Sequence, residues 1–93
     1  MVQNQFDDDE ITPSDKTRVF CRDFYVIPAK KNGFKEVTIR SGDVHRLLFF
    51  KNRLPLVCSA LGSEKFEEMA RVKRISITGP TNGANTLFKF QIL

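Results

Sequence analysis

The sequence EVTIRSGDVHRLLFFKNRLPLVCSAL, residues 36–61, contains the pattern from which the fold can be inferred. At its start, Val37 and Ile39 alternate with polar residues. Alternation with a period of two is typical of a β-strand that buries one of its faces. We therefore expect a short strand at the beginning of this stretch.

A first amphipathic helix is expected directly after the strand. Ser41 is a suitable N-cap, and the carboxylate of Asp43 falls in the first turn, where the helix dipole favours negative charge. Val44, Leu47 and Leu48 are spaced at i, i+3 and i+4, so one face of the helix is apolar.

A second amphipathic helix is expected to begin near Asn52, which interrupts the first apolar pattern and is itself a suitable N-cap. Pro55 falls in the first turn, where its missing N–H breaks no intrahelical bond. Gly62 is placed to end the helix. The apolar positions of this helix are Leu54, Val57, Cys58 and Leu61. Two short amphipathic helices joined by a few residues form a helix-turn-helix pattern.

The composition predicts one small intracellular domain. The chain has 93 residues, 41% of them hydrophobic, and its aromatic residues are nine phenylalanines and one tyrosine. We expect a single core filled largely by phenylalanine. No apolar run approaches the ~18 residues of a membrane-spanning helix, and the N-terminus does not resemble a signal peptide. Cys21 and Cys58 do not form a disulfide framework, so a reducing, cytoplasmic location is expected.

The formal charge of +4 hides an uneven distribution along the chain. Residues 1–15 hold five acidic residues and no Lys or Arg, whereas residues 16–93 hold all 15 basic residues and a net charge of +9. A small domain with such an excess of positive charge suits a polyanionic partner. The alternative is that the basic surface only maintains solubility.

The beginning of the chain is expected to be an acidic tail followed by a helix. Residues 1–12 are polar and acidic, and we expect them to be disordered. Alternatives for the run DDDE are a weak metal site or a nucleic-acid mimic that folds back on the basic surface. Thr12 can cap a helix that begins at Pro13. We expect this helix to reach about Tyr25 and to be ended by Pro28, which disfavours helical backbone before it.

The last third of the chain predicts a short helix and a β-hairpin. Ser63 can cap the sequence EKFEEMA, residues 64–70, whose glutamates face solvent. Ile75 and Ile77 alternate with polar residues in the first expected strand, and Phe88 and Phe90 alternate with other residues in the second. The turn-rich loop GPTNGAN, which begins at Gly79, separates the two strands.

These elements, in the order helix, strand, helix-turn-helix and hairpin, give an α+β chain that resembles the winged helix-turn-helix DNA-binding domain family. It is also similar to small uncharacterised archaeal proteins of this type. The resemblance covers residues 13–93, which we expect to form one winged-helix domain. The sequences that carry it are VTIR at 37–40, SGDVHRLL at 41–48, NRLPLVCSAL at 52–61 and RISITGPTNGANTLFKF at 74–90.

The resemblance implies double-stranded DNA as the partner, a role as transcription regulator or DNA-recognition accessory, and association with the nucleoid. The second helix of the pair, residues 53–61, would lie in the major groove. Arg53 is the strongest candidate for reading bases, because a guanidinium can bond bidentately to guanine. Further contacts would come from Asn52 and Ser59 to bases or phosphates, from Arg40, His45, Arg46 and Lys51 to phosphates, from Lys73, Arg74 and Lys89 at the base of the wing, and from Asn82 and Asn85 at its uncharged tip.

The sequence gives little support to catalysis or metal binding, whereas one non-enzymatic alternative to DNA binding is serious. His45 and Cys58 could form a nucleophilic pair, but Cys58 falls on the expected core face. The cysteines and the histidine lack metal-ligand spacing, and no phosphate-binding glycine loop is present. We therefore expect no enzyme, no cofactor and no metal. The serious alternative is a module for RNA, for a protein partner or for homodimerisation. An exposed Phe49 or Phe50, together with Leu56, would favour the protein partner or the homodimer.

Overall fold

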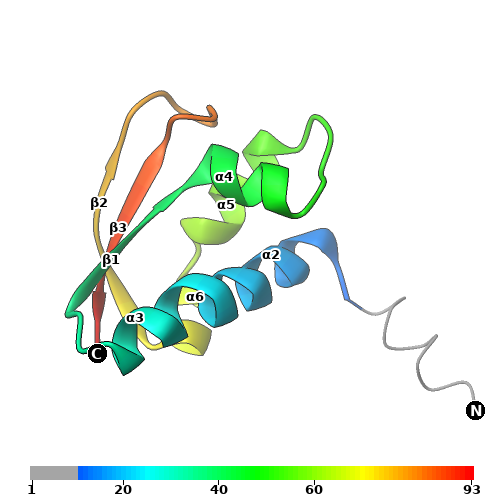
Figure 1. Cartoon of the computed structure of the whole chain (residues 1–93). Helices are drawn as coiled ribbons and strands as arrows, with labels where there is room; N and C mark the ends of the chain where they lie inside the picture. The colour runs from blue at the N-terminus through cyan, green and yellow to red at the C-terminus, as the bar shows by residue number, and fades with distance from the viewer. Residues whose placement is uncertain (1–10) are drawn as a thin grey trace, which may run out of the picture.

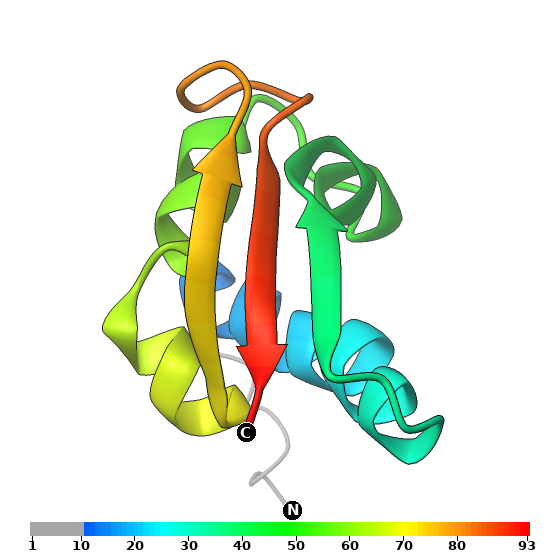
Figure 2. The same ribbon diagram turned by 90° about the vertical axis from the view of Figure 1, so that its left-hand side faces the viewer.

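Helices cover one face of a three-stranded antiparallel sheet in this computed structural model, which describes residues 11–93 (Figure 1). Turned by 90°, the three strands lie in front of the helices, and none of the described segments crosses their outer face (Figure 2). The chain is thus a compact α+β fold of two layers. The predicted disorder of the acidic tail concerns residues that, up to residue 10, lie outside the described part of the chain.

The first helical segment consists of α2 (Pro13–Cys21), the π-helical η1 (Arg22–Val26) and α3 (Ile27–Lys31). Its start was predicted correctly, because the side chain of Thr12 accepts a hydrogen bond from the N–H of Asp15 at 3.1 Å. The predicted end at Tyr25 is wrong. The chain stays helical through Pro28 and turns only at Asn32 and Gly33, where Gly33 has a φ of 82°.

The π-helical turn explains why Pro28 does not end the helix. A proline inside an α-helix removes a hydrogen bond and collides with the carbonyl one turn earlier. In η1 the N–H of Ile27 bonds to the carbonyl of Arg22, five residues back. This wider turn changes the register of the backbone bonds ahead of the proline, and Pro28 then occupies the first turn of α3, where a proline is tolerated.

The strand and the helix pair lie where the sequence predicts them, but their caps differ. The elements are β1 (Glu36–Arg40), α4 (Ser41–Leu47) and α5 (Leu54–Leu61). Ser41 is the first helical residue rather than the N-cap, a position taken by Arg40. Arg53, not Asn52, is the N-cap of α5. Neither cap uses a side-chain hydrogen bond, so other contacts must hold the ends of these helices.

Helix α6 (Glu64–Ala70) joins the helix pair to the hairpin and packs against η1, α5 and β2. Ser63 caps it as predicted, accepting a hydrogen bond from the N–H of Phe66 at 3.2 Å. Lys65 of α6 pairs with Asp15 of α2 at 2.9 Å. Arg18 of α2 donates to the hydroxyl of Ser63 at 3.0 Å and pairs with Asp15 inside its own helix at 2.6 Å. The hydrogen bond from Lys65 holds the pKa of the Asp15 carboxyl below its usual value.

The hairpin of β2 (Val72–Thr78) and β3 (Leu87–Ile92) completes the sheet in the order β1-β3-β2. Opposite Phe90 stand Val37 and Arg74, and opposite Phe88 stand Ile39 and Ile77. A bulge between Arg74 and Ser76 interrupts the register of β2. Because β2 is an edge strand, its isoleucines remain about half exposed, in contrast to the phenylalanines of the central strand β3.

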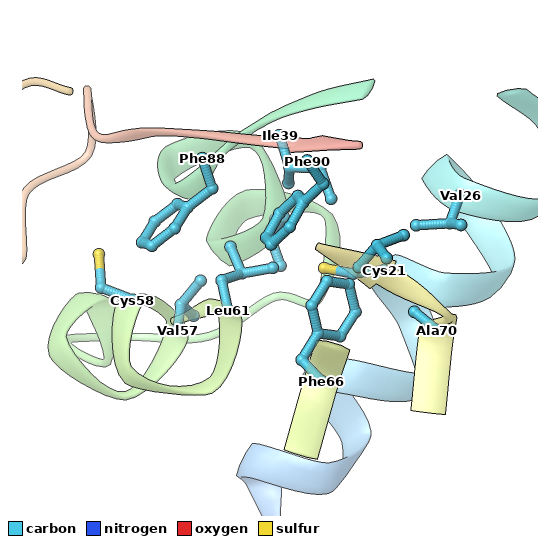
Figure 3. Close-up of a cluster of buried hydrophobic side chains, with 12 residues drawn as sticks. Cys21, Val26, Ile39, Val57, Cys58, Leu61, Phe66, Ala70, Phe88 and Phe90 are labelled. Carbon is cyan, nitrogen blue, oxygen red and sulfur yellow. The ribbon is translucent and has the colours of Figure 1, made fainter. Parts of the chain in front are cut away.

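The core is built around phenylalanine, as the composition predicts. Phe66 of α6 and Phe90 of β3 meet with ring centroids 5.2 Å apart, and Phe88 lies parallel to Phe90 at 6.5 Å (Figure 3). The predicted apolar face of α5 is largely confirmed, since Val57, Cys58 and Leu61 are buried. Both cysteines are free thiols inside this core.

Candidate nucleic-acid interface

The hairpin loop, residues 79–86, folds back onto the start of α4. The N–H of Ser41 donates to the carbonyl of Thr86 at 3.0 Å, and the N–H of Gly42 donates to the carbonyl of Ala84 at 2.9 Å. These bonds use amide groups that the first turn of a helix leaves unpaired. The loop therefore caps α4, which accounts for the absence of a side-chain cap there.

Side chains of the helix pair hold the hairpin loop in this position. The hydroxyl of Ser41 donates to the carbonyl of Gly83, and the thiol of Cys58 approaches the same oxygen at 3.8 Å. Within the loop, the buried hydroxyl of Thr86 accepts from the N–H of Gly83 at 3.2 Å and donates to the carbonyl of Pro80. Most polar groups at the base of the loop thus have partners inside the protein.

Arg40 and Asn85 were expected to contact DNA from separate elements, but they contact each other. The guanidinium of Arg40 donates to the side-chain oxygen of Asn85 and to Asp43, the latter at 2.8 Å. These bonds tie the end of β1 to the hairpin loop. Asn82 differs, because it is exposed and has left-handed backbone with a φ of 57°.

The second connection, the α4–α5 turn at residues 48–53, is shaped differently. Phe49 and Asn52 both have left-handed backbone, with φ values of 58° and 56°. The N–H of Phe49 bonds to the carbonyl of Arg46 at 3.0 Å, and the N–H of Phe50 bonds to that of His45 at 3.0 Å. This arrangement ends α4 and turns the two phenylalanines apart. Phe50 packs against the core, whereas 89% of Phe49 is exposed.

His45 stabilises the α4–α5 turn from inside. Its Nε2 accepts a hydrogen bond from the N–H of Arg53 at 3.1 Å, and its ring meets that of Phe50 edge-on at 6.1 Å. The imidazole therefore joins the last turn of α4 to the N-cap of α5. It was expected to contact phosphate, but the nitrogen that faces the turn is already used as an acceptor.

Exposed positive charge gathers around the α4–α5 turn. Arg46, Lys51 and Arg53 are all exposed. Among residues 11–93, the one ion pair that these side chains form is between Arg46 and Asp43, at 3.4 Å, and Asp43 pairs more closely with Arg40. Surface pairs of this length contribute little. The three cations are thus available to an external anion.

Helix α5 itself offers less to a nucleic acid than the sequence suggested. Its residues Leu54–Leu61 include no charged side chain. Ser59 is exposed and Leu56 is half-buried, but Ala60 is 1% exposed. Arg53 at the N-cap is the one charged residue that this helix contributes. The outward face of α5 is therefore narrow and almost neutral.

A concave surface lies between α5 and the hairpin loop and brings two of the expected residues together. It encloses about 350 Å³. The residues that line it are Cys58, Ser59, Gly62, Ile77, Gly79, Pro80, Thr81, Asn82, Thr86 and Phe88. Ser59 and Asn82 thus share one surface. Apart from the thiol of Cys58, its lining includes no ionisable group.

The three residues expected at the base of the wing do not gather there. Arg74 donates its guanidinium to the carbonyl of Gly62 at 2.6 Å and its N–H to Glu67 at 2.8 Å. Lys73 lies near the end of the sheet away from the hairpin loop, on a concave surface of about 600 Å³ that Lys30, Arg71 and Leu93 also line. Lys89 pairs with Glu36 at 3.3 Å on the outer face of the sheet. The three side chains thus lie at separate places along the hairpin strands rather than in one group.

The position of Phe49 is the feature that sequence reasoning missed. The sequence left open which of Phe49 and Phe50 is exposed, and the exposed ring is that of Phe49. Which ring stays outside depends on the left-handed backbone at Phe49. A glycine or asparagine is the usual residue at such a helix end, so the sequence carries no signal for a turn at phenylalanine.

Comparison of the chain with family models, with curated proteins and with solved structures finds no match. Among residues 11–93, no helix combines the length and the apolar character needed to cross a membrane. Over the same residues, no three His, Cys, Asp or Glu side chains are grouped so that they could hold a metal ion.

Proposed function

We propose that this chain is a winged-helix DNA-binding protein that contacts the DNA backbone mainly through its α4–α5 turn. The observation that carries the proposal is the group of three exposed cations, Arg46, Lys51 and Arg53, around one projecting turn. Phosphate contacts from Lys and Arg supply most of the non-specific affinity of proteins for DNA. The order of helix, strand, helix pair and hairpin supports the winged-helix assignment.

The two helices of the pair have different roles in this proposal. Arg53 stands at the N-terminus of α5, where an inserted helix first meets the bases. Its guanidinium forms no ion pair within residues 11–93 and would bond to a guanine edge. Arg46 and Lys51 flank it and would contact phosphates, which position the protein without reading sequence. Ser59 and Asn82 would add neutral contacts from the concave surface beside α5.

The hairpin loop has a secondary role as a wing. Its tip is uncharged and its base is bonded to α4, so a wing contact would come from Thr81 and Asn82 alone. Lys73 and Lys89 lie away from the loop and contribute through the general positive charge of the domain. Long-range attraction of this kind raises association rates more than it determines specificity.

The test is a titration of a labelled duplex at several salt concentrations with three proteins. The first is the native chain, the second carries Arg46→Ala, Lys51→Ala and Arg53→Ala, and the control carries Lys30→Ala, Lys31→Ala and Lys35→Ala. The control removes the same charge from exposed lysines at the opposite end of the molecule (Figure 1).

Each lost phosphate contact lowers the slope of log affinity against log salt by about 0.9. We expect the first triple variant to lose most of the slope and roughly 100- to 1,000-fold in affinity near 0.1 M salt. The control should lose far less. An equal loss in both variants would mean that the net charge, not the turn, binds DNA, and a native affinity that does not change with salt would contradict the proposal.

A second candidate function is a module that binds a protein or a second copy of itself. It is favoured by apolar side chains left in solvent: Phe49 of the α4–α5 turn is 89% exposed, and Val19, Phe24 and Ile27 of the first helical segment are 37%, 53% and 39% exposed. Apolar residues grouped on a surface often mark an interface. A stable dimer in sedimentation, together with no affinity for duplex DNA or RNA, would support this function over DNA binding.

A further inference from the structure

The most exposed large apolar side chain in residues 11–93 is Phe49, at the centre of the α4–α5 turn. It is 89% exposed, compared with 62% for Phe34 and 53% for Phe24. Burying a phenylalanine in the core stabilises a protein by about 1.5–3 kcal/mol. Phe50, its neighbour, packs on the core, whereas the ring of Phe49 buries little surface and so contributes little to stability.

The backbone places the ring outside and holds it there. Phe49 has a φ of 58°, a conformation that is unusual for a bulky residue. Hydrogen bonds to the carbonyls of Arg46 and His45 fix the turn on one side, and the bond from the N–H of Arg53 to His45 fixes it on the other. The ring is therefore presented from a closed, internally bonded turn.

Exposed basic residues flank this ring along the chain. Arg46 precedes it, Lys51 and Arg53 follow it, and the one described acid nearby, Asp43, is already paired with Arg40 at 2.8 Å. An apolar pocket on a neutral partner would match the ring but not the three cations. A ligand that combines a flat π-face with repeated negative charge matches both, and a nucleic acid with an unstacked base is such a ligand.

We infer that Phe49 stacks on a base, and that the ligand of the α4–α5 turn is DNA with an unpaired or unstacked base. The inference rests on the proposed DNA binding and specifies its ligand class. The cations hold the phosphates on either side, and the ring occupies the space that a neighbouring base leaves. Stacking on an aromatic side chain is sequence-tolerant, because every base has a π-face.

The absence of tryptophan from the chain allows a direct optical test. Phe49→Trp places the single indole in the turn, and Phe34→Trp places it in an exposed position before β1, at the opposite end of the molecule (Figure 2). The probes are a labelled duplex with one unpaired adenine and the same duplex fully paired. Anisotropy of the label measures binding, and quenching of the indole measures stacking.

We expect the Phe49→Trp protein to be quenched by the duplex with the unpaired adenine and the Phe34→Trp protein to be unaffected. Phe49→Ala should weaken binding of that duplex by roughly 5- to 150-fold, the range for loss of one stacked aromatic ring, and Phe49→Leu should not restore it. Both variants should keep the native far-UV circular dichroism, because the side chain is outside the core.

Two results would overturn the inference, and they differ from each other. Binding without quenching, with Phe49→Ala as tight as the native chain, would remove stacking and leave the proposed DNA binding in place. No binding of either duplex by the native chain would remove both.

Discussion

The two connections at one end of the molecule, the hairpin loop and the α4–α5 turn, use their polar groups in opposite ways (Figure 1). The hairpin loop bonds inward, through Ser41, Thr86 and the pair of Arg40 with Asn85. The α4–α5 turn is closed by its own backbone and His45, which leaves its charged side chains and one ring in solvent. The resemblance to winged helices points to the hairpin loop as a contact surface. The exposed charged side chains and the exposed ring, however, lie in the α4–α5 turn.

The difference shows how a loop can be long without being a contact surface. The hairpin loop is longer than a tight hairpin needs, and its extra residues cap α4. The turn is short, yet two residues with left-handed backbone direct its side chains outward. We therefore expect substitutions in the loop to affect stability, and substitutions in the turn to affect binding.

The largest expected effect on stability comes from Gly42→Ala. A Cβ at this position would lie 2.6 Å from the carbonyl oxygen of Ala84 and 3.0 Å from its Cβ, so the hairpin loop would have to move away from α4. We expect a loss of about 2–3 kcal/mol in the free energy of unfolding, measured with urea. Gly33→Ala is the control, since a Cβ there meets no atom and its cost, about 1 kcal/mol, comes from φ alone. Equal losses in the two variants would contradict the packing of the loop.

Thr86→Val is expected to have the next largest effect. The substitution keeps the shape of the side chain but removes a buried hydroxyl that bonds to the N–H of Gly83 and the carbonyl of Pro80. Leaving those groups without partners should lower the free energy of unfolding by about 1–2 kcal/mol. A Thr81→Val variant, at the exposed tip, should change stability by less than about 0.5 kcal/mol.

In the turn, Phe49→Gly is expected to raise stability. Glycine adopts a φ of 58° without the steric cost that phenylalanine has there, and the lost ring contributes little to the core. We expect a gain of about 1 kcal/mol in thermal or urea unfolding, together with weaker binding of DNA. Phe50→Gly, one residue later, should instead destabilise the protein, because Phe50 packs on the core.

The smallest expected change in the fold is a local opening of the hairpin loop, which thiol labelling at pH 8 can measure. Cys58 is 7% exposed and lies under the hairpin loop, so it should react whenever the loop opens. Burial raises the pKa of the Cys21 thiol to about 12, so almost none of it is thiolate at this pH. We expect Cys21 to react only on global unfolding and Cys58 to react faster in Gly42→Ala. Single Cys→Ala variants assign the two rates, and equal protection of both thiols in every variant would contradict a loop that opens separately.

Linkage at Cys21 also predicts the direction of the alkaline response. Because the folded thiol keeps its proton up to about pH 12 while the unfolded thiol loses it near the ordinary value of 9.0, the unfolded chain binds fewer protons between these values. Stability should therefore fall as the pH rises above about 9, by up to ~1.4 kcal/mol per pH unit from this group. Cys21→Ala should flatten that dependence in urea unfolding between pH 8 and 10.5.

Local periodicity was sufficient to predict the strand at residues 36–40, the helix pair and the hairpin, because each of these patterns lies within a short window of sequence. Local patterns gave wrong predictions at helix ends, where the backbone and side chains found other hydrogen-bond partners. Ser41 has the side chain of an N-cap, but its hydroxyl bonds to Gly83, far along the chain. Pro28 has the signature of a helix end, but a π-helical turn accommodates it.

The site was harder to predict than the fold. The sequence identifies the cations, and Arg46, Lys51 and Arg53 are exposed as required. It does not indicate that Arg40 and Arg74 bond to other segments of the protein or that Lys73 lies at the other end of the sheet. Those positions depend on contacts between segments far apart in sequence, which single residues do not report.

The most direct test of the central claim is a map of backbone amide shifts as duplex DNA is added at low salt. The account predicts that the largest shifts fall on residues 45–54, with smaller ones at Ser59 and Asn82. The base of the hairpin loop, residues 83–86, should change little, because its groups are bonded to α4. Shifts centred on the hairpin loop or on the outer face of the sheet, with residues 45–54 unchanged, would contradict it.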